Sequence, residues 1–282
     1  MIWRCRDQAF DLSRRVRVMG IVNVTPDSFS DGGRYLDPAA AIQRGHELLA
    51  EGADILDLGA ESTRPGSAPV AAAEQWRRLE PVLLCLREER PDAVLSIDTR
   101  DASVAERALD AGVRIVNDVS ALTDPAMARV VARTGAGLVL MHMRGTPETM
   151  QRDTAYADVI AEVAAFLRER LACAEAAGVP RECVAFDPGI GFGKSAEGSL
   201  QLLARLAELV ALGQPVLVGA SRKSFLARLT GDEGPPAGRL PASLAAAALA
   251  VFEGAHLLRV HDVAATLRVA RIAEAARAAR QA

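Results

Sequence analysis

The feature that most constrains the fold of this chain is a junction that recurs along it. At each junction a glycine lies between an alanine-rich amphipathic stretch and a short apolar run. The junction glycines are Gly52, Gly112, Gly135, Gly178 and Gly254. A glycine in this position predicts a left-handed cap that ends a helix and leads directly into a buried strand. The repeated order of helix and then strand predicts an α/β protein.

Eight short apolar runs accompany these junctions. They lie at residues 18–22, 55–58, 94–97, 115–116, 138–141, 184–186, 216–218 and 257–260. The runs lack the alternation of strands that have one solvent-exposed face, which favours a parallel sheet buried on both faces. Eight strand and helix units in a chain of this length match a (β/α)8 TIM barrel better than an open doubly wound sheet. No linker interrupts the pattern, so residues 1–282 are expected to form one domain.

Composition excludes several functional classes. The chain has 282 residues, of which 50% are hydrophobic and 24% charged, with a formal net charge of -3. Neither disorder nor a basic surface for nucleic acid is therefore expected. The longest apolar run is about half of what a membrane helix needs, and the first ten residues contain Arg and Asp where a signal peptide would be apolar. The four cysteines are widely spaced, which favours free thiols. We expect a cytoplasmic protein that binds no membrane.

Polar side chains follow the apolar runs, at the strand ends where a barrel carries its chemistry. Asn117 and Asp187 are expected to form hydrogen bonds with the edge of a planar heterocycle. The Asp can accept from adjacent N–H groups, and the Asn offers both a donor and an acceptor. The alternative is that Asn117, like Asp98, simply caps the helix that follows it.

A second group of strand-end residues is cationic. Its members are Arg64, Arg222, Lys223, Arg259 and His261. The loops after the last two strands of a barrel commonly hold phosphate, and residues 221–224 are expected to open a helix whose N–H groups favour an anion. The set predicts a phosphorylated or carboxylated substrate. Lys194 and Lys223 are the only lysines among many arginines, which marks them as positions where Arg would not serve.

Residues 189–194 contain three alternating glycines followed by Lys194. Their spacing matches neither a Walker loop nor a Rossmann fingerprint, so neither ATP nor NAD is assigned. The glycines predict a tight turn beneath Phe192 and a close approach of the backbone to a ligand. Phe192 and Phe29 both fall in strand-end loops, where stacking on a ligand and plain packing are both open.

Motifs in order along the whole chain resemble those of dihydropteroate synthases. They are MGIVNVTPDSFSDGG (residues 19–33), GADILDLGAESTRPG (residues 52–66), SIDT, NDVSA, LMHMRGTPETM, FDPGIGFGK, GASRKSF and RVHDV. The resemblance implies that 6-hydroxymethyl-7,8-dihydropterin pyrophosphate and 4-aminobenzoate condense to 7,8-dihydropteroate with loss of pyrophosphate, in folate biosynthesis. It also implies Mg²⁺, sensitivity of the family to sulfonamides, and a homodimer, for which the last two helices, rich in Ala and Leu, would supply the face.

The resemblance further implies a role for each candidate residue. The pterin contacts would be Asp98, Asn117, Asp187 and Lys223, with Arg259 packing on the ring. The pyrophosphate side would be Asn23, Thr63, Arg64, Arg259 and His261, with Asn23 also approaching Mg²⁺. Ser224 would contact the carboxylate of 4-aminobenzoate, and Arg222, Phe29 and Phe192 complete the substrate-binding candidates. The catalytic candidates are Asp98, Lys223, Arg259 and His261.

The implied chemistry explains why such residues are needed. Breaking the C–O bond to pyrophosphate builds positive charge on the pterin methylene and negative charge on the leaving group, so cations and a metal lower the barrier. Three alternatives remain open. A pterin-binding methyltransferase barrel would not need the cations after the last two strands. A Schiff-base aldolase would use Lys223 as a nucleophile that borohydride traps. A non-catalytic pterin-binding module would bind without turnover.

Overall fold

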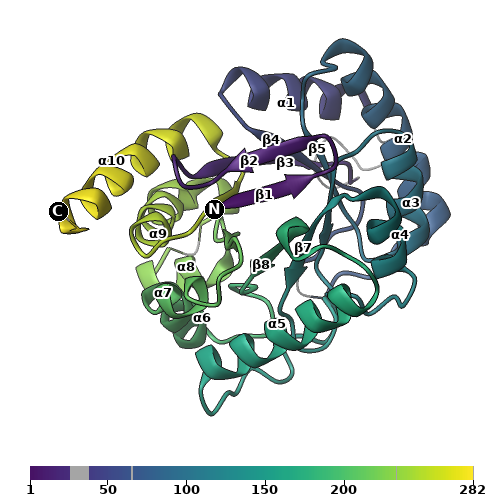
Figure 1. Ribbon diagram of the computed structural model, residues 1–282. Helices are drawn as coiled ribbons and strands as arrows, with labels where there is room; N and C mark the ends of the chain where they lie inside the picture. Colours follow the sequence, from purple (N-terminus) through teal and green to yellow (C-terminus); the bar gives the residue numbers. More distant parts are fainter. Residues whose placement is uncertain (26–37, 65, 233, 282) are drawn as a thin grey trace.

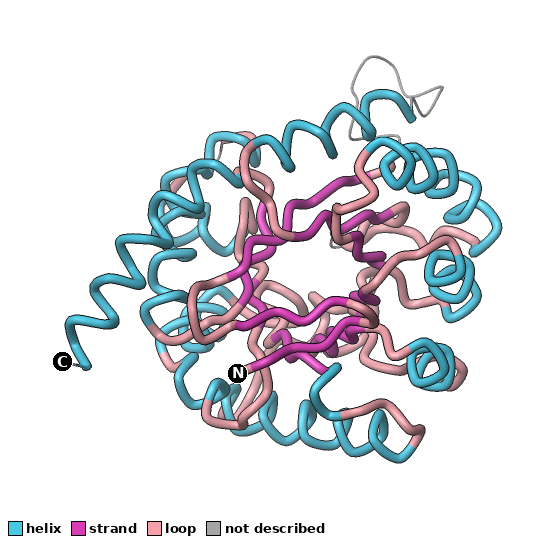
Figure 2. The backbone as a smooth tube through the Cα atoms, turned by 45° about the horizontal axis from the view of Figure 1, so that its top comes forward, coloured by secondary structure: helices cyan, strands magenta, loops and turns pink. Residues whose placement is uncertain are grey.

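The computed structural model describes residues 1–25, 38–64, 66–232 and 234–281. Eight parallel strands form a barrel with helices around its outside (Figures 1 and 2). The strands are β3 (Arg17–Asn23), β4 (Ile55–Gly59), β5 (Leu95–Asp98), β6 (Ile115–Asp118), β7 (Gly137–Met141), β8 (Val184–Asp187), β9 (Leu217–Val218) and β10 (Leu257–Val260). Their hydrogen-bonded order is β8-β7-β6-β5-β4-β3-β10-β9, and a parallel bridge between Phe186 and Val216 brings the two ends together. The predicted (β/α)8 barrel is confirmed.

The helices lie where the sequence predicts them, between successive strands and, for α10, after the last strand. They are α1 (Pro38–Ala50), α2 (Ala72–Glu89), α3 (Ala102–Asp110), α4 (Met127–Thr134), α5 (Val159–Ala176), α6 (Ala196–Ala204), α7 (Leu206–Val210), α8 (Ser224–Thr230), α9 (Leu240–Phe252) and α10 (Val263–Gln281), with 3-10 turns η2 (Arg181–Cys183) and η3 (Pro236–Arg239). All five junction glycines have a positive φ, between 65° and 105°, which confirms their role as helix ends. Among the described residues, none of these helices is long and apolar enough to cross a membrane.

An antiparallel hairpin that the sequence did not predict covers the amino-terminal end of the barrel. It consists of β1 (Ile2–Cys5) and β2 (Gln8–Asp11), and Figure 1 shows it in purple across the strands. Trp3, which is fully buried, packs against Phe10 with ring centroids 5.8 Å apart. Below the hairpin, every barrel strand or the residue just before it adds one side chain to the same cluster. These side chains are Met19, Ile55, Val94, Ile115, Val139, Ala185, Leu217 and Leu257.

The polarity of the barrel interior changes directly above this apolar floor. Side chains two residues apart on a strand point to the same face, so the next inward position on each strand lies two residues further along. On five strands that position is polar. The residues are Asp57, Ser96, Asn117, Asp187 and Arg259. The strand alternation thus places a ring of polar groups at the carboxyl-terminal half of the barrel, where the sequence predicts the site.

Candidate active site

The centre of the candidate site is Arg259 on β10, held between two carboxylates. Its Nε donates to Asp57 Oδ2 at 2.6 Å, and its Nη2 donates to Asp98 Oδ2 at 2.7 Å. Asn117 Nδ2 donates to the same Asp57 oxygen at 3.0 Å. Four residues from four strands are therefore fixed relative to one another, and the structure brings the predicted Asp98, Asn117 and Arg259 together.

Asp187, at the end of β8, lies in the same polar layer. Its Oδ1 accepts a hydrogen bond of 2.7 Å from the backbone N–H of Gly189. Burial raises the pKa of Asp187 to about 6, although the Gly189 N–H opposes the shift. Burial likewise raises the pKa of Asp98 to about 7, with Arg259 opposing it. A ligand that donates N–H groups to these carboxylates would therefore stabilise their ionised forms.

Lys223, just before α8, contacts Phe192. Its Nζ lies 3.5 Å from the centroid of the Phe192 ring. Burial, with help from the Arg259 charge, lowers the pKa of Lys223 to about 7. Phe192 itself is buried, with 7% of its surface exposed, and packs with Val119 and Met141. Phe192 is therefore a packed residue that also contacts a cation, and its stacking on a ligand stays a prediction.

The glycine segment owes its shape to Lys194. The Lys194 ammonium lies within 2.8 to 3.2 Å of His142 Nδ1 and of the carbonyl oxygens of His142, Gly189 and Phe192. Burial lowers the pKa of Lys194 to about 7. Gly189 has a φ of 64°, and a Cβ there would stand 1.9 Å from the His142 carbonyl oxygen. The backbone at Gly189 therefore closely approaches a buried lysine and the neighbouring loop, whereas the predicted approach of this segment to a ligand stays a prediction.

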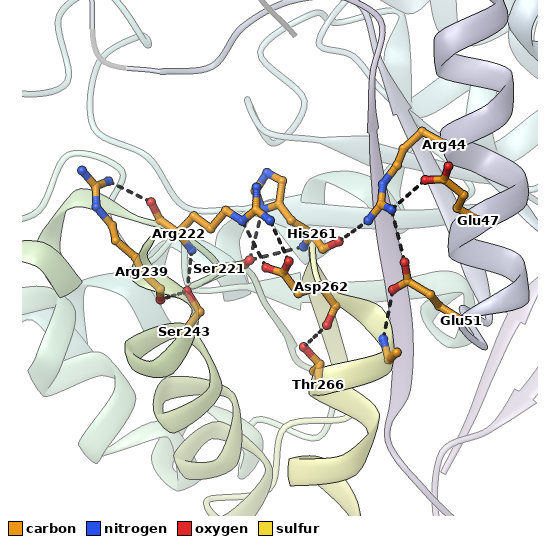
Figure 3. A network of polar contacts seen from close by, with 11 residues as sticks. Arg44, Glu47, Glu51, Ser221, Arg222, Arg239, Ser243, His261, Asp262 and Thr266 are labelled. Carbon is orange, nitrogen blue, oxygen red and sulfur yellow. Dashed lines mark hydrogen bonds and ion pairs between the residues drawn. The ribbon is translucent and has the colours of Figure 1, made fainter. Parts of the chain in front are cut away.

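The loops after β9 and β10 carry the remaining predicted cations, and Figure 3 shows how they are tied together. Arg222 forms a two-point ion pair with Asp262, with Nη2–Oδ1 at 2.6 Å and Nε–Oδ2 at 3.1 Å. Burial lowers the pKa of His261 to about 3, and the charges of Arg222 and Arg259 act in the same direction. Burial and these charges therefore favour the neutral imidazole of His261 near pH 7, in contrast to the cation expected from the sequence.

The other predicted residues lie around the mouth. Asn23, at the end of β3, and Thr63 are half-buried, whereas Arg64 and Ser224 are exposed. Ser224 is the first residue of α8. Phe29 falls outside the described residues, so its predicted role stays a prediction. The part of the chain that the structure describes contains no group of three or more His, Cys, Asp or Glu side chains placed to hold a metal.

Asp57 and Ser96 are the residues of this site that the sequence did not reveal. Both are fully buried and lie opposite each other in the register of β4 and β5. Asp57 Oδ1 and Ser96 Oγ have no hydrogen-bond partner among the described atoms. The sequence does contain one sign of Asp57, which is a single carboxylate inside the apolar run at residues 55–58. A carboxylate is rarely buried in a strand unless another group pairs with it, so this position indicates a buried polar partner.

Comparison with known proteins agrees with this geometry. The pterin-binding enzyme family matches residues 19–261 of the chain. The dihydropteroate synthase of Escherichia coli K12 is 42% identical over 273 residues, which cover 97% of this chain and 95% of that protein. The chain belongs to the dihydropteroate synthase family. The resemblance in the motifs is thereby confirmed over nearly the full length.

Solved dihydropteroate synthases share the fold. The Xanthomonas albilineans dihydropteroate synthase with 4-aminobenzoic acid has a TM-score of 0.91 and 46% identity, covering 98% of each chain. The Yersinia pestis dihydropteroate synthase with a sulfonamide drug complex has a TM-score of 0.92 and 41% identity, covering 99% of this chain and 100% of that one.

Proposed function

We propose that this chain condenses 6-hydroxymethyl-7,8-dihydropterin pyrophosphate with 4-aminobenzoate to 7,8-dihydropteroate and pyrophosphate. The observation that carries the proposal is the polar layer inside the barrel, where buried carboxylates and Asn117 lie beside Arg259. A ligand bound there meets negative charge on its ring side. The loops after β9 and β10 offer two cations on the other side, Lys223 and the Asp262-paired Arg222, together with the neutral imidazole of His261. This separation of charge matches a reaction that makes a cation and an anionic leaving group.

The pterin side of the proposal rests on the acceptors. Asp187 and Asn117 would take N–H groups on the pterin edge, and Asp98, at the next position along β5, would face the ring as positive charge develops. The raised pKa values of Asp98 and Asp187 come mainly from burial. Once ionised, a buried carboxylate interacts strongly with a nearby cation, which supports this role. Arg259, already fixed by Asp57 and Asp98, would offer the flat face of its guanidinium to the ring.

The leaving-group side would combine Arg64, Thr63 and His261 with Asn23. Mg²⁺ keeps several waters and is held by few protein oxygens when it binds phosphates. Asn23 lies at the carboxyl end of β3, and its amide oxygen is a suitable ligand for Mg²⁺. The site therefore fits a Mg²⁺ ion that enters with the substrate. When bound, Mg²⁺ supplies charge neutralisation to the pyrophosphate.

A pyrophosphate-release assay tests the proposal. We expect release to accompany formation of dihydropteroate when both substrates are present. Under single-turnover conditions we also expect release at a measurable rate without 4-aminobenzoate, because the amine is already neutral near pH 7 and departure of pyrophosphate activates the pterin. Binding of the pterin without any release would identify a non-catalytic module. A strict need for 4-aminobenzoate, with one ionisation near neutrality that a single mutation abolishes, would instead favour a base-assisted displacement.

We further propose a cytoplasmic homodimer. All four cysteines, which lie within the described ranges, are free thiols, as expected of a reducing compartment. Two helices support the dimer, α9 and α10, which pack side by side (Figure 1). They expose Leu249 and Ile272.

A further inference from the structure

Ser221 and His261 make two contacts with each other across the loops after β9 and β10. The backbone N–H of His261 donates to Ser221 Oγ at 3.2 Å, and Ser221 Oγ lies 3.0 Å from His261 Nδ1. Figure 3 shows this pair beside the ion pair of Arg222 and Asp262. The two loops are therefore joined by two parallel bridges, one from residues 221 and 261 and one from residues 222 and 262.

The donor and the acceptor in the bond between Ser221 Oγ and His261 Nδ1 can be assigned from the other hydrogen bond of the Ser221 hydroxyl. Ser221 Oγ already accepts the backbone N–H of His261, so its own proton needs an acceptor. Within the described residues, His261 Nδ1 is the one acceptor found for it. We therefore assign the bond as Ser221 O–H to Nδ1, which leaves the imidazole proton on Nε2. No hydrogen bond to Nε2 is found among the same residues.

The surroundings keep this imidazole neutral. Among the described residues, the charges that act on it most strongly are those of Arg222, Arg259 and Lys223, with the Asp262 carboxylate opposing them. Burial and the three cations disfavour a further positive charge on the ring, and they lower the pKa of His261 to about 3. A neutral ring has one N–H donor, so its use depends on which nitrogen carries the proton.

The backbone around the pair is held in place from three directions. Arg222 has a φ of 60°, in the left-handed region that a non-glycine residue seldom adopts. Its N–H donates to Ser243 Oγ at 2.9 Å, and its carbonyl oxygen accepts from Arg239 Nη1 at 3.0 Å. On the other loop, the His261 carbonyl oxygen accepts from Arg44 Nη2 at 2.7 Å. This strain and these contacts indicate a conformation that the fold is built to keep.

We propose that Ser221 is a positioning residue that holds His261 in the neutral Nε2–H tautomer, so that His261 presents a single donor to an anionic oxygen of the substrate. The inference rests on the proposed function for the identity of that oxygen, which would belong to the pyrophosphate. The tautomer itself does not depend on the reaction. His261 then acts as a hydrogen-bond donor and neither as a cation nor as a proton donor to the leaving group.

Histidine ¹⁵N NMR tests the tautomer directly, because the chain has only four histidines. The His261 signal is assigned by its loss in His261→Gln. We expect the Nε2–H pattern in the wild type, with no titration between pH 5 and 8. Ser221→Ala should give a mixture of tautomers, and Ser221→Thr should restore the single one. Ser243→Ala, which removes a hydroxyl from the same network without touching His261, should leave the pattern unchanged. An Nδ1–H pattern or a titration in this range in the wild type would overturn the proposal.

Kinetics separate this inference from the proposed function. We expect Ser221→Ala to raise the KM of the pterin pyrophosphate about three- to tenfold, the range of one lost hydrogen bond, with unchanged affinity for the pterin that lacks pyrophosphate. Gln places an N–H near the position of Nε2 and Asn does not, so His261→Gln should keep more activity than His261→Asn even where the Ser221 variants fail to fold. Equal loss in both would contradict the proposal. If the wild type releases no pyrophosphate while the Nε2–H pattern is present, the proposed function fails and the tautomer stands.

Discussion

At the scale of single residues, Asp187 is the carboxylate whose replacement should affect pterin binding most directly. In Asp187→Asn the amide oxygen would keep the bond from the Gly189 N–H, because only the oxygen can accept it. The NH₂ group would then face the ligand donors. We expect the fold to be kept and pterin affinity to fall by about 10- to 150-fold, as for loss of a charged hydrogen bond. Calorimetry measures this, with the exposed helix cap Asp158→Asn as control. Unchanged affinity would remove Asp187 from the site.

The raised pKa values of Asp187 and Asp98 predict a pH dependence of binding. In the free protein Asp187 holds its proton below pH about 6, whereas a pterin N–H needs the ionised form. Affinity should therefore be lost as the pH falls, by about tenfold at pH 5, and Asp98 should add to the loss. Calorimetry from pH 5 to 8 measures this, and Asp187→Asn should flatten the profile. An affinity that rises on acidification would contradict the assignment.

The raised pKa values of Asp98 and Asp187 affect stability in the opposite direction, because stability falls as the pH rises. The unfolded carboxyls lose their protons near the ordinary value of 3.8, while the folded ones keep theirs to about pH 6 and 7. The folded state therefore binds more protons in this range. The contribution of Asp98 and Asp187 to the free energy of unfolding falls as the pH rises from about 4 to 7.

Lys194 is expected to matter for stability, since it joins the ends of β7 and β8. Lys194→Met removes the donor for three backbone carbonyl oxygens and His142 Nδ1. We expect the free energy of unfolding to fall by about 2 to 4 kcal/mol, because buried acceptors lose their partner. Urea denaturation measures it. Arg205→Met, which breaks an exposed pair with Glu208, is the control. Unchanged stability would mean that the cost of burying the ammonium offsets its bonds.

What the sequence reveals at this scale depends on how far apart the partners are. Asp98, Asn117 and Asp187 follow apolar runs and could be predicted from position alone. Asp57 stands out only as a carboxylate inside an apolar run, and its partners could not be predicted because they lie 60 and 202 residues away. The neutrality of His261 is hidden for the same reason, since it comes from burial and from cations on other loops.

At the scale of elements, the hairpin β1–β2 should contribute to stability and not to chemistry. Trp3 is fully buried at the closed end of the barrel, and its Nε1 donates to the Cys183 carbonyl oxygen at 2.9 Å. We expect Trp3→Ala to lower the free energy of unfolding by about 3 to 5 kcal/mol with kcat unchanged in the folded fraction. Ile2→Ala, on the exposed face of the same strand, is the control. A large loss of kcat would show that the floor and the mouth are coupled.

The contrast between the barrel strands and this hairpin shows which elements a sequence can predict. Each barrel strand is buried on both faces and follows a glycine or other helix end, so its apolar run stands out. The hairpin strands have four residues each, burial alternates only along β1, and both strands are held in place by packing on the apolar floor. Short strands of this kind carry too few residues for a periodic signal.

At the scale of the whole molecule, the residues that stabilise the barrel and the residues of the proposed site lie at opposite ends of its axis. The end under the hairpin is a closed apolar cluster. The opposite end gathers buried charges whose burial raises or lowers their pKa values, which costs stability and prepares them for a ligand. The candidate residues that the structure describes come from one barrel, so we expect a single copy to be active.

The proposed dimer would bury apolar side chains that α9 and α10 expose. Ile272 on α10 is 73% exposed and Leu249 on α9 is 50% exposed, in a chain that otherwise buries most large apolar side chains. We expect a dimer by sedimentation equilibrium, and Ile272→Glu should shift it to monomer, because a buried unpaired charge in the interface is costly. Leu84→Glu, at an exposed apolar position on α2, is the control. The monomer should still release pyrophosphate, since the site lies within one barrel. A dimer that survives Ile272→Glu would place the interface elsewhere, and a monomer without activity would show that the partner orders the loops around the mouth.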